Sequence, residues 1–185
     1  GGASIVLEIG AGTWKLESEE GVRMDGDKAE HIKEAAPVLS RYVDALGIRT
    51  FSSGVSDAED DLDTILQGFR KYATVPVVSM ESAREHPCQG LADMLTLKER
   101  FGNLKGLPVT LSWAPHIKPL PKAVPNSFLL SAIAAGCEVR IAHPEGYELA
   151  PSVLAEAESY AKQSGGSFKV YNNREEALQN SVCLY

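Results

Sequence analysis

The residues best suited to chemistry are concentrated in His86-Pro87-Cys88-Gln89, which opens a predicted helix over 87–101. A histidine directly before a helix that begins with proline lies beside free backbone N–H groups, and these favour an anion. His86 can donate a hydrogen bond to a carbonyl oxygen, and Gln89, one turn later, can accept one from an amide –NH₂ group. A carbamoyl group offers both partners. The alternative is a capping histidine followed by a buried glutamine.

Three further side chains invite a chemical interpretation. Arg49 follows Ile48 at the end of a predicted strand, where a guanidinium can bind a phosphate or polarise a carbonyl, although the position alone favours an ordinary surface arginine. Cys88 has no general base nearby in the sequence, so we expect a small buried apolar side chain rather than a nucleophile. His116 lies in a proline-stiffened loop that also carries Trp113, and this loop could form one wall of a cleft.

Two weaker motifs are incomplete. Gly10-Ala11-Gly12 follows a predicted strand but lacks the third glycine of a dinucleotide-binding fingerprint, so a simple turn is the alternative. Asp25-Gly26-Asp27 resembles the start of a calcium loop without its later ligands, and we interpret it as a turn with Asp27 as a helix N-cap. No pair of cysteines has zinc-ligand spacing, so no metal site is predicted.

Short β-branched runs alternate with longer segments of helical period, which is typical of parallel sheets covered by helices. We therefore predict an α/β fold with two Rossmann-like lobes, their parallel sheets flanked by helices, and a boundary near 102–106. Both lobes look truncated, because the chain starts and stops on predicted strands. The predicted strands are 5–9, 45–51, 75–80, 107–113, 138–142, 167–171 and 182–185, and the predicted helices are 28–43, 57–72, 87–101, 126–135, 151–164 and 174–179.

Composition limits the function classes. The chain has 185 residues and a formal net charge of -7, which argues against non-specific binding to nucleic acid or to an anionic membrane. No apolar run reaches the length of a membrane span, and no signal peptide is recognisable. Three well-separated cysteines fit free thiols in a reducing cytoplasm.

The motif around His86 resembles a known family. His86-Pro87-Cys88-Gln89, followed by Leu91-Ala92-Asp93 and Thr96, is similar to the signature of aspartate and ornithine carbamoyltransferases. Asn126-Ser127 and the run 141–147 also resemble ornithine-type members. The stretches around Trp14 and Trp113 are similar to the branch that acts on N-acetylornithine or N-succinylornithine.

The resemblance implies roles for particular residues. Residues 1–102 would form a carbamoyl-phosphate-binding lobe with a connecting helix at about 87–101, and residues 103–185 an acyl-ornithine-binding lobe. Arg49, His86 and Gln89 would be catalytic. Carbamoyl phosphate would be bound by Trp14, Arg49, His86, Pro87, Cys88 and Gln89, with Trp14 supplied by a neighbouring subunit of a homotrimer. Glu81 and His116 would bind the acyl-ornithine, and no cofactor is implied.

Ala29 is informative because acetylornithine members carry a glutamate at the matching position. A glutamate would repel the free carboxylate of a succinyl group, so Ala29 favours N-succinylornithine, with N-acetylornithine as the alternative acceptor. The family's phosphate loop and its His-Cys-Leu-Pro loop are absent, so we expect this piece alone to be inactive. A non-catalytic binding paralogue and a nucleotide-binding protein remain competing interpretations.

Overall fold

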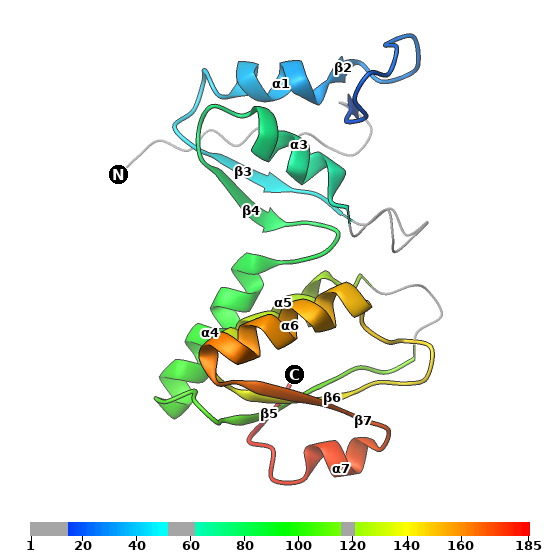
Figure 1. Cartoon of the computed structure of the whole chain (residues 1–185). Helices are drawn as coiled ribbons and strands as arrows, with labels where there is room; N and C mark the ends of the chain where they lie inside the picture. Colours follow the sequence, from blue (N-terminus) through cyan, green and yellow to red (C-terminus); the bar gives the residue numbers. More distant parts are fainter. Residues whose placement is uncertain (1–14, 52–61, 116–120) are drawn as a thin grey trace. The chain divides into compact units, whose positions relative to one another are not determined.

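The computed structural model describes residues 15–51, 62–115 and 121–185 (Figure 1). The chain divides into two compact units, Gly1–Ile48 with Leu62–Val78, and Arg49–Asp61 with Ser79–Tyr185. The α/β prediction is confirmed. The predicted strand at 5–9 lies outside the described residues. Within these ranges, no helix is both long enough and apolar enough to span a bilayer.

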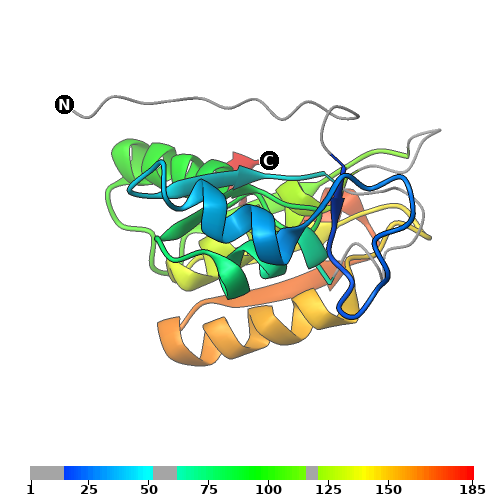
Figure 2. The same ribbon diagram turned by 90° about the horizontal axis from the view of Figure 1, so that it is seen from above.

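The first unit is built around two amphipathic helices, α1 (Ile32–Leu39) and α3 (Thr64–Tyr72), which lie side by side (Figures 1 and 2). Their contact buries Ile32, Ala36 and Phe69. Two short parallel strands, β1 (Leu16–Glu17) and β2 (Glu30–His31), precede α1, and β3 (Leu46–Arg49) pairs with β4 (Val77–Glu81).

The first helix begins later than the sequence predicted. His31, not Asp27, is its N-cap, and His31 Nδ1 accepts the backbone N–H of Lys33 at 3.0 Å. The segment before it is extended because it pairs with β1, as the Ala29 N–H to Lys15 O bond of 3.0 Å shows. Asp27 forms an ion pair with Lys15 instead. The prediction of a helix over 28–43 was therefore wrong at both ends.

The second unit holds a four-stranded parallel sheet in the order β7-β6-β5-β8. In Figure 1, α5 and α6 cover one face of this sheet, α7 lies on the other, and α4 packs against α5. Parallel strands need such crossover helices, because their ends cannot be joined by a tight turn. The bounds are α4 (Pro87–Phe101), β5 (Pro108–Ser112), α5 (Ala123–Ala134), β6 (Glu138–Ala142), α6 (Pro151–Ser164), β7 (Ser167–Tyr171), α7 (Arg174–Leu178) and β8 (Cys183–Leu184).

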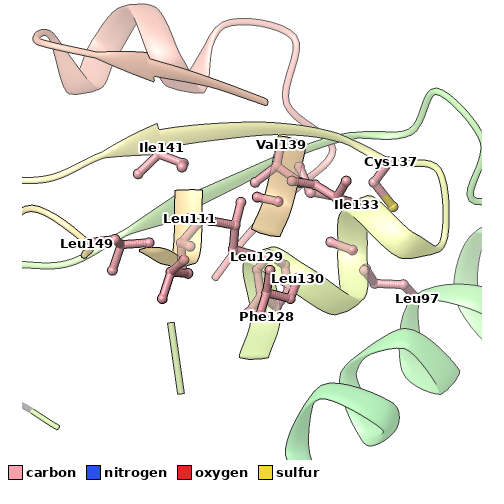
Figure 3. Packing of buried hydrophobic residues seen from close by; sticks show 14 of the residues in the cluster. Leu97, Leu111, Phe128, Leu129, Leu130, Ile133, Cys137, Val139, Ile141 and Leu149 are labelled. Carbon is pink, nitrogen blue, oxygen red and sulfur yellow. The ribbon is translucent and has the colours of Figure 1, made fainter. Parts of the chain in front are cut away.

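The core of the second unit is centred on α5 (Figure 3). This helix is apolar around most of its circumference, because α4, α6 and the sheet all pack against it. It begins three residues before the predicted start, with Pro125 in its first turn. The buried side chains in Figure 3 include Leu97, Leu111, Phe128, Leu129, Ile133, Val139 and Ile141.

Gly90 sets how closely α4 can approach α5. A Cβ atom added at Gly90 would lie 3.1 Å from the backbone oxygen of Ser127 and still closer to Ser131 Oγ. Glycine therefore brings the first turn of α4 against α5. The contact also explains why α4 belongs to the second compact unit, whereas the functional lobes 1–102 and 103–185 remain a prediction.

Gly90→Ala should destabilise the protein by about 1–3 kcal/mol, because the added methyl group meets backbone that cannot easily move. Denaturant unfolding measures this loss. Adding Ser131→Ala removes the nearest hydroxyl and should restore part of the stability. An unchanged unfolding midpoint in Gly90→Ala would show that the two helices are not packed this closely.

Candidate functional site

The first turn of α4 carries the candidate site, and its geometry comes from a histidine cap. α4 begins at Pro87, as the sequence predicted, and His86 is the N-cap. His86 Nδ1 accepts the backbone N–H of Gln89 at 3.2 Å. In a neutral imidazole the acceptor nitrogen carries no proton, so the proton of His86 lies on Nε2. The cap therefore presents an N–H donor on the side of the ring away from the helix.

The capping alternative for His86 is thus confirmed, but it leaves a ligand-binding atom available. The free backbone N–H groups expected for an anion at this position are largely used. Pro87 has none, and the N–H groups of Gln89 and Gly90 also bond to His86 O at 3.0 and 3.1 Å. Any anion bound near this turn must therefore find other donors.

Two hydrogen bonds join the turn that precedes α4 to α5. The His86 N–H donates to Ser127 Oγ at 2.6 Å, and Asn126 Nδ2 donates to Arg84 O at 2.9 Å. Both α5 side chains are only 2% exposed. Since buried hydrogen bonds are costly to break, His86 has a defined position before any ligand arrives.

A buried carboxylate links the end of β3 to this turn. Arg49 Nε donates to Glu81 Oε2 at 2.7 Å, and His86 Nε2 lies 3.6 Å from the same oxygen. The second distance is too long for a good hydrogen bond, so the Nε2 proton is not consumed. The family resemblance implied separate roles for Arg49 and Glu81, and no sequence pattern indicated their pairing.

Arg49 keeps most of its hydrogen-bonding capacity. Its guanidinium lies 4.9 Å from the centroid of the Phe51 ring, and its side chain is 57% exposed. Only Nε has a recorded hydrogen-bond partner within 15–51, 62–115 and 121–185. Among the described residues, the terminal nitrogens of the fork have no recorded partner, so binding of an oxyanion or a phosphate by Arg49 stays a prediction.

The other residues of the motif differ in their surroundings. Gln89 is half-buried and donates through Nε2 to Asp93 Oδ1 at 2.8 Å. Cys88 is exposed, with Sγ 3.9 Å from Ser79 O, so the prediction of a buried thiol was wrong. The residue stands at the second position of the helix.

Ala29 lies in the first unit, at the end of an exposed loop over 18–29. The loop is closed at its base by Glu17, whose carboxylate accepts from the backbone N–H groups of Ser18 and Glu19 and from Lys28 Nζ. The bond from Glu19, followed by that from Lys28, lowers the pKa of Glu17 to about 2. No sequence motif indicated this carboxylate.

Several candidates cannot be placed. Trp14, His116 and Gly10-Ala11-Gly12 lie outside the described residues. In the part of the chain that the structure describes, no cluster of three or more His, Cys, Asp or Glu side chains could hold a metal. Arg49, Glu81, His86 and Gln89 are the sequence candidates that the second unit brings together.

The low pKa of Glu17 predicts a specific loss of stability in acid. Because the pKa is lower in the folded protein, the contribution of Glu17 is complete above the ordinary value of 4.5 and disappears as the pH falls towards about 2. Glu17→Gln should therefore unfold more readily than the wild type at neutral pH. The difference between their denaturation midpoints should shrink through this pH window.

Lys28→Met removes the partner of the same carboxylate and should show the same convergence with the wild type in acid. A difference that stays constant from neutral pH to the lowest pH at which the proteins remain folded would contradict this role of the pair.

Comparison with known proteins adds to this geometry. Residues 5–99 match the family model described as aspartate/ornithine carbamoyltransferase, carbamoyl-P binding domain. An N-succinylornithine carbamoyltransferase of Bacteroides thetaiotaomicron is 47% identical over 153 residues, which is 83% of this chain and 48% of that protein. An N-acetylornithine carbamoyltransferase of Xanthomonas campestris is 40% identical over 100% of this chain and 55% of its own length.

A solved structure is similarly close. It is an N-acetyl-L-ornithine transcarbamylase in which one glutamate is replaced by alanine, complexed with carbamyl phosphate and N-succinyl-L-norvaline. It superposes with a TM-score of 0.91 at 41% identity, over 98% of this chain and 55% of the other. The chain thus spans about half the length of the relatives that it matches.

Proposed function

Because the chain belongs to the aspartate/ornithine carbamoyltransferase family, we propose that the protein transfers a carbamoyl group from carbamoyl phosphate to the δ-amine of N2-succinyl-L-ornithine, a step of arginine biosynthesis. One observation carries the chemical part of this proposal. The first turn of α4 offers an N–H donor at His86 Nε2 and an acceptor at Gln89 Oε1. A carbamoyl group needs a donor for its oxygen and an acceptor for its –NH₂.

The reaction is an acyl transfer that uses the open donors of the site. The neutral δ-amine attacks the carbonyl carbon, a tetrahedral oxyanion forms, and the C–O bond to phosphate breaks. His86 Nε2–H and the terminal nitrogens of Arg49 stabilise the charge that grows on the oxygen and on the departing phosphate. The amine loses its proton to the departing phosphate as N-succinylcitrulline forms. Holding both substrates in line supplies much of the remaining rate.

Other roles rest on the resemblance of the motifs. Pro87 and Cys88 complete the carbamoyl side of the pocket, and Glu81 and His116 contact the acyl-ornithine. Trp14 covers the carbamoyl phosphate of a neighbouring subunit, so the working form is a homotrimer. The relatives are about twice as long as this chain.

Ala29 supports succinylornithine as the acceptor. It stands where acetylornithine members carry a glutamate. Its side chain is exposed on the loop over 18–29, whose ends are held together by the bond between Lys28 and Glu17. Four transcarbamylase structures with one glutamate replaced by alanine, valine, serine or proline hold N-succinyl-L-norvaline. An uncharged residue leaves room for the succinyl carboxylate, whereas a glutamate repels it. The acetylornithine relative, which matches the whole chain, keeps N-acetylornithine as the second candidate.

A carbamoylation assay of the full-length protein tests the proposal. With carbamoyl phosphate present, citrulline derivatives should form from N-succinylornithine faster than from N-acetylornithine or ornithine. Arg49→Ala should lower kcat by roughly a hundredfold or more, because it removes donors to the developing charge. A folded wild-type protein that binds carbamoyl phosphate but turns over none of the three acceptors would instead be a binding paralogue.

Ala29→Glu should shift the preference from N-succinylornithine towards N-acetylornithine, by about tenfold or more in the ratio of kcat/KM values, because two carboxylates then share one pocket. Ala29→Gln is the matched control, since it adds nearly the same volume without the charge. If Gln changes the ratio as much as Glu does, the cause is size rather than charge. An unchanged ratio in both variants would remove Ala29 from the acceptor site.

A further inference from the structure

We propose that Asp93 is a positioning residue, which fixes the side-chain amide of Gln89 with its carbonyl oxygen outward and so makes the site select a carbamoyl group over an acetyl group. The inference rests on the proposed function, because it concerns how the same site recognises carbamoyl phosphate. It adds a residue whose effect passes through Gln89 rather than through contact with the substrate.

The geometry follows from helical spacing. Gln89 and Asp93 are four residues apart on α4, so their side chains lie on the same face of the helix. Gln89 Nε2 donates to Asp93 Oδ1 at 2.8 Å. Both residues are half-buried, so water competes less for this bond than it would on an open surface.

The chemistry of the carboxylate decides which way the amide faces. A carboxylate has only acceptor oxygens, whereas a glutamine amide has a donor end and an acceptor end that are nearly the same size. Asp93 can therefore hold only the –NH₂ end of Gln89. The carbonyl oxygen Oε1 is then directed away from Asp93 and has no hydrogen-bond partner recorded among the described residues.

Asp93 lies close enough to Tyr185, at the end of β8, for its charge to act on that hydroxyl. The Tyr185 hydroxyl faces its carboxylate, and the Tyr185 ring stacks on Phe128 with centroids 4.1 Å apart. Burial, the negative charge of Asp93 and a weaker hydrogen bond to it raise the pKa of Tyr185 to about 12. Tyr185 therefore remains neutral beside Asp93 at ordinary pH. The Tyr185 backbone N–H donates to Thr110 O at 2.8 Å and so continues the ladder between β5 and β8.

An outward carbonyl oxygen distinguishes two ligands of nearly equal shape. Carbamoyl phosphate carries an –NH₂ group on its carbonyl carbon, where acetyl phosphate carries a methyl group. Gln89 Oε1 accepts a hydrogen bond from the –NH₂ group and gains nothing from the methyl group. If the amide were free to rotate, its –NH₂ end would face the ligand part of the time, and this discrimination would fall. A pair that only stabilises the helix would have no such effect.

The test compares the two ligands in the full-length protein. The KM for carbamoyl phosphate and the inhibition constant of acetyl phosphate are measured for the wild type, Asp93→Ala and Glu99→Ala. Asp93→Ala should raise the KM for carbamoyl phosphate by about tenfold, as expected for the loss of a charge-assisted hydrogen bond. The inhibition constant of acetyl phosphate should remain unchanged. Glu99→Ala removes the same charge from an exposed position of α4 and should change neither constant.

A double-mutant cycle with Gln89→Ala separates positioning from a structural role. If Asp93 acts through Gln89, Asp93→Ala should have no further effect on the KM for carbamoyl phosphate in the Gln89→Ala background. Asp93→Asn still offers an acceptor oxygen but can also turn its own amide, so its ligand preference should be intermediate. If Asp93→Ala does not fold, the same constants are measured for Asp93→Asn in its place.

Three results would overturn the inference. Asp93→Ala could raise the KM for carbamoyl phosphate and the inhibition constant of acetyl phosphate equally, or could change neither constant. It could also raise the KM for carbamoyl phosphate by its full factor in the Gln89→Ala background. In these cases a wild type that turns over carbamoyl phosphate would leave the proposed function standing. A wild type that neither binds nor consumes carbamoyl phosphate would overturn the proposed function and this role with it.

Discussion

The hydrogen bond from the Gln89 N–H to His86 Nδ1 is the interaction on which the site depends. It closes the N-terminus of α4, and it determines which ring nitrogen of His86 carries the proton. A helix cap and a catalytic donor are usually regarded as alternative roles for a histidine. In His86 one ring nitrogen caps the helix and the other is the donor that the proposed reaction uses, because a neutral imidazole has one acceptor and one donor.

The same principle orients the other polar groups of the second unit. Asp93 accepts from Gln89, and Glu81 accepts from Arg49, so each carboxylate takes up one donor of a larger group. The remaining atoms of that group then have a defined direction before a ligand binds. Such pre-orientation reduces the entropy that binding must overcome. It also depends on dense packing, which Gly90 supplies where α4 meets α5.

The sequence predicted the second unit better than the first for identifiable reasons. The elements α4, β6, α6 and β7 agree with their predicted bounds, because a proline at the start of α4 and α6 and a clear apolar period mark them. The motif at His86 was recognisable because its residues are adjacent. The bond between Arg49 and Glu81 joins residues 32 apart, and no local pattern encodes such a pairing.

Under the proposed function, chemistry and acceptor choice occupy different kinds of structure in this chain. His86 and Gln89 belong to a helix whose first turn packs against α5, and a change there also affects folding. Ala29 ends an exposed loop that is stabilised at its base by Glu17 and Lys28, and a change of its side chain leaves those contacts in place. Such a separation would let a loop residue change the accepted acyl group while the helix proposed to carry the reaction remains intact.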